Sequence, residues 1–456
     1  MKFLKNIWLV IVVLLSSCVN DDFARGDFLN RPPRGRILTG PPILSIGEFV
    51  SVVPVSQSSH FIFPSSHRFQ KIIETGDALT EGGMLPARND FTGFVPINDS
   101  SSLGYLSISS EASPGGVTVL DIILNADSKL WEVTASSAID FSGVGGTKNN
   151  CSGTVTPWNT IISCEERIQL VDNNADGYND FGWAVEIDPV TKKVIDKRWA
   201  LGNFAHENIT IHSNLRTAYQ GADSNPGYLY KFVADNERDL SSGKLFVYFG
   251  SKAGVGSWIQ LNNTTIEERN TTLDQSAAVG ATIFNGIEDV EIGPDGMIYF
   301  AVKGEGQIYR FQDSDPITGV DVIMETYVGN MDYTITHVGG KTTVPWGVGN
   351  DNLAFDDDGN LWVLQDGGEN YIWVVEKEHS QDNPKVKLFG IAPLGSEPTG
   401  ITFTPDYKHL FISIQDPDTT NNSSEQIDAG GNSVKFNTHI SLVMARNENL
   451  GSKLEL

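Results

Sequence analysis

A strand–turn–strand unit that recurs along the chain is the feature that most narrows the possible folds. Each copy has an apolar strand, a short turn with Asp, Gly or Pro, and a second apolar strand. The copies span Glu288–Phe300, Asn352–Val363 and Thr399–Phe411. Successive turns are about 50 to 60 residues apart, which is the length scale of one four-stranded blade of a β-propeller. The unit therefore predicts an all-β fold, and a β-propeller in particular.

Composition supports one large folded domain with many turns. The chain has 456 residues, of which 40% are hydrophobic and 45 are glycines. This apolar content suffices for a sizeable core and excludes disorder along the whole length. Few segments have the periodicity of an amphipathic helix, and a β-sandwich would space its strands more evenly. The net charge of −25 argues against a nucleic-acid partner, because phosphate groups require a basic surface.

The first residues have the pattern of a bacterial lipoprotein signal. Lys2 and Lys5 precede the apolar run Ile7–Leu15, and Ser16-Ser17-Cys18 follows it. That run is shorter than the roughly 20 residues that a spanning helix needs. We expect a signal peptide over residues 1–17, lipidation of Cys18, a flexible tether over residues 18–42, and one propeller domain over residues 43–456. An ordinary signal peptide with an incidental cysteine is the alternative.

The residue after the cysteine bears on the destination of the protein. Val19 occupies the position where an inner-membrane retention signal would have Asp. We therefore expect an outer-membrane lipoprotein that faces the periplasm or the cell surface. Its contact with the membrane would be through the lipid alone.

Two cysteines remain in the mature chain, and one of them precedes two carboxylates. Both lie within Asn149–Glu166, which ends in Cys164-Glu165-Glu166. A thiolate beside two carboxylates is a costly concentration of negative charge unless a multivalent cation neutralises it. The alternative is a disulfide between Cys151 and Cys164, which an oxidising compartment would favour.

The segment Asn149–Glu166 resembles the signature of the PhoX-type alkaline phosphatases, a family of secreted bacterial enzymes. Other stretches resemble the same family in the same order, so the resemblance extends from about residue 100 to residue 418. These stretches are Gly104–Glu111, Ser113–Val117, Gly182–Pro189, Phe204–Glu207, Gly221–Asp223, Tyr230–Val233, Asn285–Asp289, Asp351–Phe355, Asp366-Gly367, Glu397–Gly400 and Gln415.

The resemblance implies a six-bladed propeller with a central site of ferric iron and calcium ions that hydrolyses phosphate monoesters. It implies that Cys164 is an iron ligand and that Glu288 is a bridging carboxylate with a catalytic role. Hard oxygen ligands suit Ca²⁺, and a thiolate with carboxylates suits iron. The expected partner is a small-molecule phosphate ester, and we expect a monomer. The further implied metal ligands are Glu111, Glu165, Glu207, Asp223 and Glu397.

One departure from the family pattern concerns the phosphate. Where the family has Arg-Pro-Glu, this chain has Gly286-Ile287-Glu288, so the arginine that would clamp the phosphate is absent. We expect Lys303 or Arg310 to supply the missing cation, and we assign Lys303 a catalytic role on this basis.

Two assignments stay open in the sequence. In a regular strand Cys164 and Glu166 would share a face, but strand ends curl, so either Glu165 or Glu166 could face the metal. His206 is expected to act as a general acid or base, and a hydrogen-bonded structural histidine is the alternative.

A short acidic segment has the opening of a calcium-binding loop. Asp172, Asn174 and Asp176 have the D-x-N-x-D-G spacing. Trp183 takes the twelfth position, where an EF-hand has Glu. The segment is either a peripheral calcium loop or a solvated acidic turn.

Two other functions are alternatives to a phosphatase. The unit Asn352–Trp362 is similar to units of gluconolactonase-like propellers, which would make the protein a calcium-dependent lactonase or esterase. The glycine at position 286 would also fit a non-catalytic propeller with structural metals and a loop face that binds a glycan or a protein. The sequence has neither a G-x-S-x-G nucleophile elbow nor a G-x-x-x-x-G-K-[ST] phosphate loop.

Overall fold

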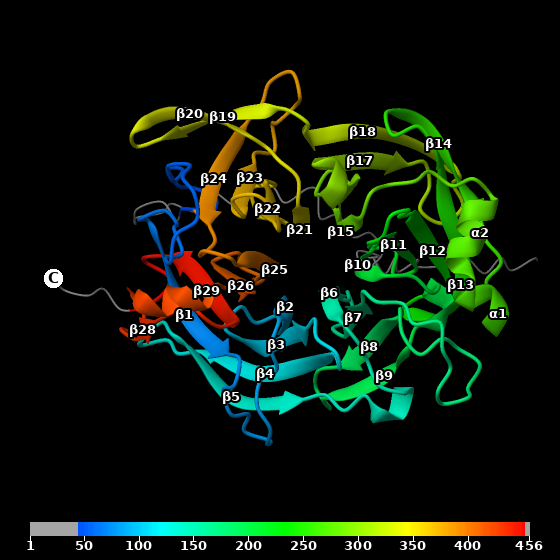
Figure 1. Ribbon diagram of the computed structural model, residues 1–456, viewed down its shortest axis with the longest axis horizontal. Helices are drawn as coiled ribbons and strands as arrows, with labels where there is room; N and C mark the ends of the chain where they lie inside the picture. The colour runs from blue at the N-terminus through cyan, green and yellow to red at the C-terminus, as the bar shows by residue number, and fades with distance from the viewer. Residues whose placement is uncertain (1–43, 452–456) are drawn as a thin grey trace, which may run out of the picture. The chain divides into compact units, whose positions relative to one another are not determined.

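Antiparallel sheets arranged around a common centre make up most of the regular structure (Figure 1). The computed structural model describes residues 44–451. The all-β, propeller-like fold predicted from the repeated unit is confirmed. The expected signal peptide, the lipidated Cys18 and the tether over residues 18–42 lie outside the described residues and stay predictions. Within residues 44–451, no helix has the length and apolar character needed to cross a membrane.

Four sheets have four strands each. In three of them the strand order follows the chain, and the fourth combines strands from both ends of the described residues. The first two are β2 (Asn89–Pro96), β3 (Leu103–Ser110), β4 (Gly116–Leu124) and β5 (Trp131–Ala138), and then β6 (Asn150–Val155), β7 (Ile161–Glu165), β8 (Ala184–Asp188) and β9 (Lys193–Lys197). The other two are β21 (Asn350–Phe355), β22 (Leu361–Gln365), β23 (Tyr371–Val375) and β24 (Val386–Ile391), and then β25 (Glu397–Phe403), β26 (His409–Gln415), β29 (Ile440–Arg446) and β1 (His67–Glu74).

A nine-stranded sheet contains two more runs of consecutive strands. The strand β14 (Gly254–Gln260) joins them, because it pairs with β13 on one side and with β18 on the other. The runs are β10 (His206–Ile211), β11 (Thr217–Ala222), β12 (Leu229–Asn236) and β13 (Asp239–Gly250), and then β15 (Ile287–Ile292), β16 (Ile298–Val302), β17 (Gln307–Asp313) and β18 (Asp321–Gly329).

Smaller elements occupy the connections between the sheets. They comprise two short α-helices and two two-stranded ladders, which fits the scarcity of helical patterns in the sequence. The elements are α1 (Ile266–Asn270), α2 (Thr272–Ala278), β19 (Asp332–His337) with β20 (Gly340–Pro345), and β27 (Gln426–Ile427) with β28 (Ser433–Val434).

The three repeated sequence units each form the first two strands of a run. They correspond to β15–β16, β21–β22 and β25–β26. The first strands of all six runs lie innermost and contact one another in cyclic order: β2, β6, β10, β15, β21 and β25 (Figure 1). The repeat therefore marks the strands that surround the axis.

Pairing between the two ends of the described chain closes the ring of sheets. Residues His67–Glu74 of β1 pair antiparallel with Ile440–Arg446 of β29. Since β29 also pairs with β26, the N-terminal strand becomes the outermost strand of the last sheet. The ring cannot open without breaking a backbone ladder.

Apolar side chains fill the space between neighbouring sheets. Phe94 of β2 stacks on Phe411 of β26 with ring centroids 5.6 Å apart. Trp131 of β5 packs against the same ring of Phe411 with centroids 5.2 Å apart. These rings belong to a cluster with Leu106, Leu120 and Val443, which joins the first and last sheets. Burial of large aromatic groups contributes about 1.5–3 kcal/mol each, so this packing holds the sheets at fixed angles to the axis.

A β-bulge interrupts each innermost strand near its start. Two residues there oppose one residue of the neighbouring strand, which re-aims the side chains at that point. Because side chains on a regular strand alternate between its faces, the bulge is needed to turn two consecutive residues toward the axis. The pairs are Asp90-Phe91, Cys151-Ser152, Glu207-Asn208, Glu288-Asp289, Asp351-Asn352 and Gly400-Ile401.

We expect Gly400→Ala to destabilise the protein by about 3 kcal/mol or more, measured by chemical denaturation. Gly400 has a φ of 55°, and a Cβ there would lie 2.5 Å from the Asp90 carbonyl oxygen and 2.6 Å from Phe91 Cα. Gly431→Ala is the control, because Gly431 also has a positive φ (82°) but no atom within 4 Å of its Cβ position. The control should cost only about 1 kcal/mol for the left-handed backbone. Equal losses in the two variants would contradict the close approach at the bulge.

Candidate metal centre

The first residue of five of the six bulges lines a central cavity of about 320 Å³. Each of these five residues carries a carboxylate or a thiol. The bulge of β25 begins instead with Gly400, and Glu397 reaches the cavity from the start of that strand. The bulges thus collect ligand-bearing side chains from five strands that are far apart in the chain, and β25 adds Glu397 from outside its bulge. The five residues are Asp90, Cys151, Glu207, Glu288 and Asp351.

A second ring of charged residues follows the second strand of each run. These positions are equivalent in the six runs, since each comes directly after the last residue of the strand. Five are acidic and one is Lys303, and all but Asp223 line the cavity. They are Glu111 after β3, Glu166 after β7, Asp223 after β11, Lys303 after β16, Asp366 after β22 and Asp416 after β26.

The side chains of the two rings come close enough to share metal ions. Their ligand atoms form four groups, and within each group all atoms lie within 4.8 Å of one another. Neighbouring groups share Cys151, Glu207 or Asp351, so the arrangement is a continuous arc that suits several cations rather than one. The groups are Asp90–Glu111–Cys151, Cys151–Glu166–Glu207, Glu207–Glu288–Asp351 and Asp351–Asp366–Glu397.

Burial and mutual repulsion raise the pKa of these carboxyl groups. Burial, followed by the charge of Glu111, raises the pKa of Asp90 to about 7. Burial, followed again by Glu111, raises the pKa of Glu166 to about 10. The pKa of Glu207 also lies well above its ordinary value, because the group is buried and Glu288 is close. Multivalent cations would remove this penalty, since they stabilise the ionised carboxylates.

Several buried oxygens of the site have no hydrogen-bond partner among residues 44–451. They include Glu207 Oε2, Asp351 Oδ1 and Gln415 Oε1. Leaving such atoms unpaired costs about 1–3 kcal/mol each, so a ligand is expected to meet them. Oxygen-rich groups suit Ca²⁺, and the thiol of Cys151 among carboxylates suits iron. The donor set therefore fits the two metals that the family resemblance implies.

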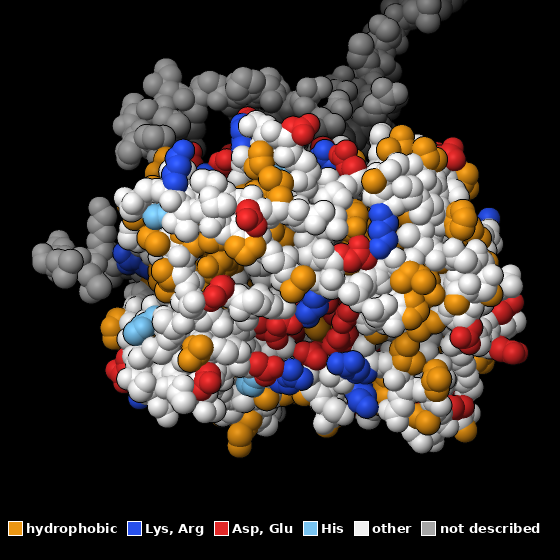
Figure 2. All heavy atoms as spheres, turned by 45° about the horizontal axis from the view of Figure 1, so that its top comes forward, with side chains coloured by type: hydrophobic (Ala, Val, Ile, Leu, Met, Phe, Trp, Pro, Cys, Tyr) orange, Lys and Arg blue, Asp and Glu red, His pale blue; other side chains and the backbone are white. Residues whose placement is uncertain are grey.

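Basic side chains stand at the mouth of the acidic cavity. Figure 2 shows a hollow with Asp and Glu side chains inside it and Lys or Arg side chains at its edge. Among the lining residues, the basic ones are Arg88, Arg167 and Lys303. Arg88 Nη2 lies 2.6 Å from Asp416 Oδ2. The rim of the cavity therefore carries positive charge beside an otherwise acidic lining.

Lys303 connects the mouth to the ligand groups. Its Nζ lies 2.6 Å from Asp366 Oδ2 and 3.4 Å from Glu288 Oε1, and its side chain is 33% exposed. Burial alone would lower the pKa of Lys303, but Glu288, Asp351 and Asp366 outweigh it and raise the pKa above its ordinary value. The side chain therefore stays charged and can bind an anion, and it cannot serve as a base at neutral pH.

The structure brings together five of the residues selected from the sequence. Glu111, Glu207, Glu288, Glu397 and Lys303 all line the cavity. Asp223 belongs to none of the four ligand groups, but it lies next to them. After burial, Asp223 is the main charge that raises the pKa of Glu288. Burial and then Glu111 raise the pKa of Glu166, and Asp223 adds to this effect.

Cys164 and Glu165 lie outside the cavity, which corrects their assignment as metal ligands. Cys164 shares a face of β7 with Ile162, and both pack into an apolar cluster with Phe204. Both cysteines are free, so the alternative of a disulfide does not hold in the structure. Glu165 forms a fully buried ion pair with Lys197, 3.0 Å from Oε1 to Nζ. Cys151 and Glu166 occupy the cavity instead.

His206 and Arg310 also lie away from the cavity. The ring of His206 is fully buried, its Nε2 is 2.9 Å from the Gly202 carbonyl oxygen, and Phe204 stacks on it at 3.7 Å. Burial lowers the pKa of His206 to about 4, so the ring is neutral and structural, and the acid–base role is corrected. Arg310 pairs with Glu325 at 2.6 Å and does not replace the missing arginine.

The acidic loop predicted to bind calcium uses its carboxylates to hold its own backbone. Asp172 accepts hydrogen bonds from the amides of Asp176 (3.1 Å) and Gly177 (2.9 Å). Asp176 in turn accepts from the Tyr178 amide and from the Asn174 side chain. The three residues are exposed and belong to none of the four ligand groups. The peripheral calcium loop stays a prediction.

Five residues of the ligand groups were not assigned as metal ligands from the sequence, where Glu166 was left open as the alternative to Glu165. Three of the six innermost strands place Asn directly before the bulge, as Asn89-Asp90, Asn150-Cys151 and Asn350-Asp351. This shared pair could have identified the ligand position on those strands. The positions after the second strand have no comparable signal, because only the strand end defines them. The five residues are Asp90, Cys151, Glu166, Asp351 and Asp366.

Comparison with known proteins shows a match to a family model and a likeness to solved structures. A model of the family described as alkaline phosphatase PhoX matches residues 125–418. No curated protein matches the chain. The structure of Pseudomonas fluorescens PhoX in complex with vanadate, a transition state analogue, is similar with a TM-score of 0.70 and 20% identity, over 88% of this chain and 98% of that one. This likeness supports the fold.

Two other solved structures are more distant. A protein of unknown function from Bacteroides thetaiotaomicron has a TM-score of 0.44 and 9% identity, over 83% of this chain and 76% of that one. A gluconolactonase from Xanthomonas campestris has a TM-score of 0.37 and 11% identity, over 87% of this chain and 99% of that one. Neither likeness is strong enough to bear on function.

We expect Cys151→Ser to lower the metal content of the purified protein, because it removes the thiol that two ligand groups share. Cys164→Ser is the matched control: it places a hydroxyl among apolar side chains and should cost about 1–3 kcal/mol of stability, with the metal content unchanged. Elemental analysis and thermal denaturation of both variants measure the two effects. Metal loss in the Cys164 variant alone would contradict the placement of the thiols.

Proposed function

The chain belongs to the PhoX alkaline phosphatase family, and on this premise we propose that it is a metal-dependent phosphatase that hydrolyses phosphate monoesters of small molecules. The single observation that carries the proposal is the arc of four overlapping ligand groups with a charged lysine at its edge. The alternatives of a lactonase and of a non-catalytic binding module are not favoured by the family match.

We infer that calcium and ferric iron occupy the arc. The groups that contain Cys151 would hold iron, since the thiol is the softest donor of the site. The groups built only from carboxylates, around Glu207, Asp351 and Glu397, would hold calcium. When bound, such ions polarise phosphoryl oxygens and lower the pKa of bound water. The protein itself contributes the fixed positions of the ligands, which six separate strands support.

The residues at the mouth are suited to hold an anionic phosphate. Lys303 is fixed by Asp366 and Glu288 and keeps its charge, so its Nζ can donate to a phosphoryl oxygen. Arg88 is held by Asp416 on another part of the rim. The cavity of about 320 Å³ has room for a phosphoryl group but not for a large leaving group, which would remain at the open side. This favours small or terminal phosphate monoesters.

The backbone at Gly286 supports Lys303 as the replacement for the family's arginine. The amide of Lys303 donates to the carbonyl oxygen of Gly286 at 3.0 Å. A Cβ at position 286 would lie 3.9 Å from Lys303 Cβ and 2.7 Å from Asp223 Oδ1. Lys303 therefore enters the cavity from beside position 286, while a side chain at 286 itself would displace Asp223.

We infer six blades for the propeller. Six innermost strands each begin a run of four antiparallel strands, and two of these runs share the nine-stranded sheet through β14. We also propose that Cys18 is lipidated and holds the enzyme at the outer membrane as a monomer. The sequence pattern around Cys18 motivates this proposal, and labelling with a radioactive fatty acid would test it.

Removal of metal is expected to abolish hydrolysis of p-nitrophenyl phosphate by the protein over residues 44–456. Without cations the buried carboxylates repel a phosphate, so chelation should lower kcat/KM at least 10³-fold. Addition of calcium and ferric iron should restore activity, and calcium alone should restore it only if the iron stays bound during chelation. Full activity in metal-free protein would contradict the proposal.

Lys303→Ala is expected to lower kcat/KM for the same ester by about 10²–10³-fold, because one charged donor to the phosphate is lost. Lys303→Arg should retain more activity, since the charge is kept. Lys252→Ala is the matched control: Lys252 is also 33% exposed and pairs with Glu305 at 2.6 Å, but it does not line the cavity. A similar loss in the control would refute a specific role for Lys303.

A further inference from the structure

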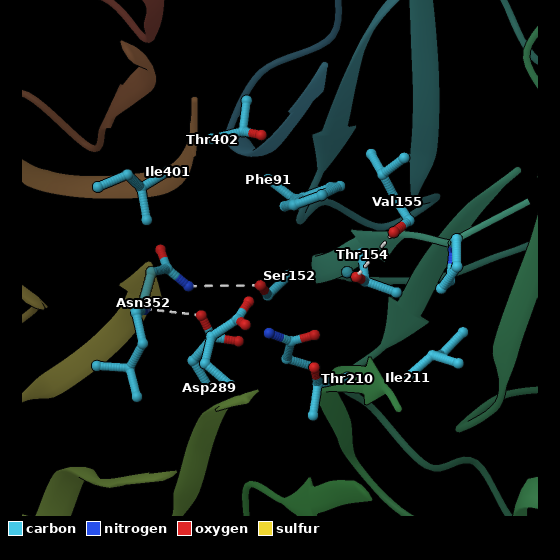
Figure 3. Close-up of a pocket in the computed structure, with 15 residues that line it drawn as sticks. Phe91, Ser152, Thr154, Val155, Thr210, Ile211, Asp289, Asn352, Ile401 and Thr402 are labelled. Carbon is cyan, nitrogen blue, oxygen red and sulfur yellow. Dashed lines mark hydrogen bonds between the residues drawn. The ribbon is translucent and has the colours of Figure 1, made fainter. Parts of the chain in front are cut away.

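The second residue of each bulge faces a different cavity from the first. Figure 3 shows this second cavity, whose volume is about 270 Å³. Five of the six innermost strands therefore present two consecutive side chains to two separate spaces on the axis, and β25 presents only Ile401 to the second space. The first space is the candidate metal centre. The six residues that face the second are Phe91, Ser152, Asn208, Asp289, Asn352 and Ile401.

Two acidic residues line the second cavity without a cation beside them. Asp289 and Glu291 lie two residues apart on β15 and therefore share a face of the strand. No Lys, Arg or His is among the described residues that line the cavity. Asp289 is only 3% exposed, and its carboxylate accepts from the backbone amides of Leu353 (2.7 Å) and Val290 (3.2 Å). Glu291 is half-buried. Two neighbouring carboxylates, one of them buried, are costly without a counter-ion.

Two hydroxyl groups of the cavity are also poorly paired within the protein. Thr210 of β10 is 7% exposed and lines the cavity, and its hydroxyl has no hydrogen bond among residues 44–451. Ser152 of β6 is 1% exposed, and its hydroxyl only accepts a long bond of 3.4 Å from Asn352 Nδ2. Figure 3 shows Ser152, Asp289 and Thr210 around the same space. A threonine side chain that is more than nine-tenths buried, lines a cavity and has no hydrogen-bond partner in the described part of the protein is an independent sign that a ligand or water meets its hydroxyl there.

We propose that this cavity binds one calcium ion, with Asp289, Glu291 and Thr210 as ligands, at a site separate from the metal centre. Calcium takes six to eight oxygens at flexible geometry, and a mixture of carboxylates, a hydroxyl and water satisfies it. A cavity of about 270 Å³ has room for an ion and several waters, because each water occupies roughly 30 Å³. Mg²⁺ fits less well, since it demands near-ideal octahedral geometry.

The ion would join neighbouring innermost strands behind the metal centre. Asp289 and Glu291 come from β15 and Thr210 from β10, and these strands contact one another. On the same two strands the preceding bulge residues are Glu288 and Glu207, which line the metal centre. A cation bound to the second residues would hold both bulges in place. The inference does not depend on phosphatase activity, because it concerns different side chains.

Metal counting on Glu291→Gln tests the site. Purified wild type, dialysed against calcium-free buffer after saturation with Ca²⁺, is compared with the variant by elemental analysis. We expect the variant to hold one calcium equivalent fewer and the same amount of iron. Glu81→Gln is the control, because Glu81 is an exposed carboxylate outside both cavities, and it should keep the full calcium content.

Each outcome of the calcium and iron measurement either supports or overturns the proposed calcium site. An unchanged calcium content in Glu291→Gln would overturn the proposal and leave a water-filled cavity. Loss of iron together with calcium would also overturn it, since the site would not be separate. If Glu291→Gln fails to fold, Thr210→Val takes its place. We expect this variant to lose one calcium equivalent to a chelator faster than the wild type does. An unchanged rate of calcium loss would count against the proposal. Failure of the phosphatase assay would leave the calcium count unaffected.

Discussion

The β-bulge of the innermost strand is the constraint on which the rest of the site depends. A regular strand turns successive side chains to opposite faces, so only every second residue could face the axis. The extra residue at Glu288-Asp289, and at the equivalent pairs of four of the other five strands, presents two consecutive side chains to the axial cavities. Without it, only one residue of each pair could face the axis, so one strand could not line both cavities.

The ring architecture then determines which charges meet. Five runs contribute a bulge residue and five contribute the residue after their second strand, so residues as far apart in the chain as Asp90 and Asp416 line one cavity. The cost of this convergence is electrostatic, as the raised pKa of Asp90, Glu166 and Glu207 indicates. Closure of the ring through β1 and β29 resists the repulsion, because the strands cannot separate without breaking the ladder. Lys303, the one basic residue of the second ring, relieves part of the repulsion because it pairs with Glu288 and Asp366.

The strand repeats were predictable because they are local. The alternation of apolar residues and the Asp-Gly type turns in Glu288–Phe300 and Asn352–Val363 depend on neighbours in the chain, and both units form the expected strand pairs. The charged residues Glu207, Glu288 and Lys303, which were selected from the sequence, line one cavity. The choice between the cysteines was not predictable, since Cys151 and Cys164 lie on paired strands and only the bulge decides which one faces the axis.

The sequence by itself determined the fold class and the family, because a repeated pattern of strands and an ordered set of motifs are properties of the chain read in order. The tertiary structure alone decided which residues form the centre. Glu166 rather than Glu165 lies in the cavity, and Glu165 forms a buried ion pair with Lys197. His206 lies outside the cavity, where its neutral ring stacks on Phe204. The physical reason is that a side chain's direction at a bulge or a strand end depends on the pairing register with a neighbouring strand, and that register is set by contacts that the linear sequence does not contain.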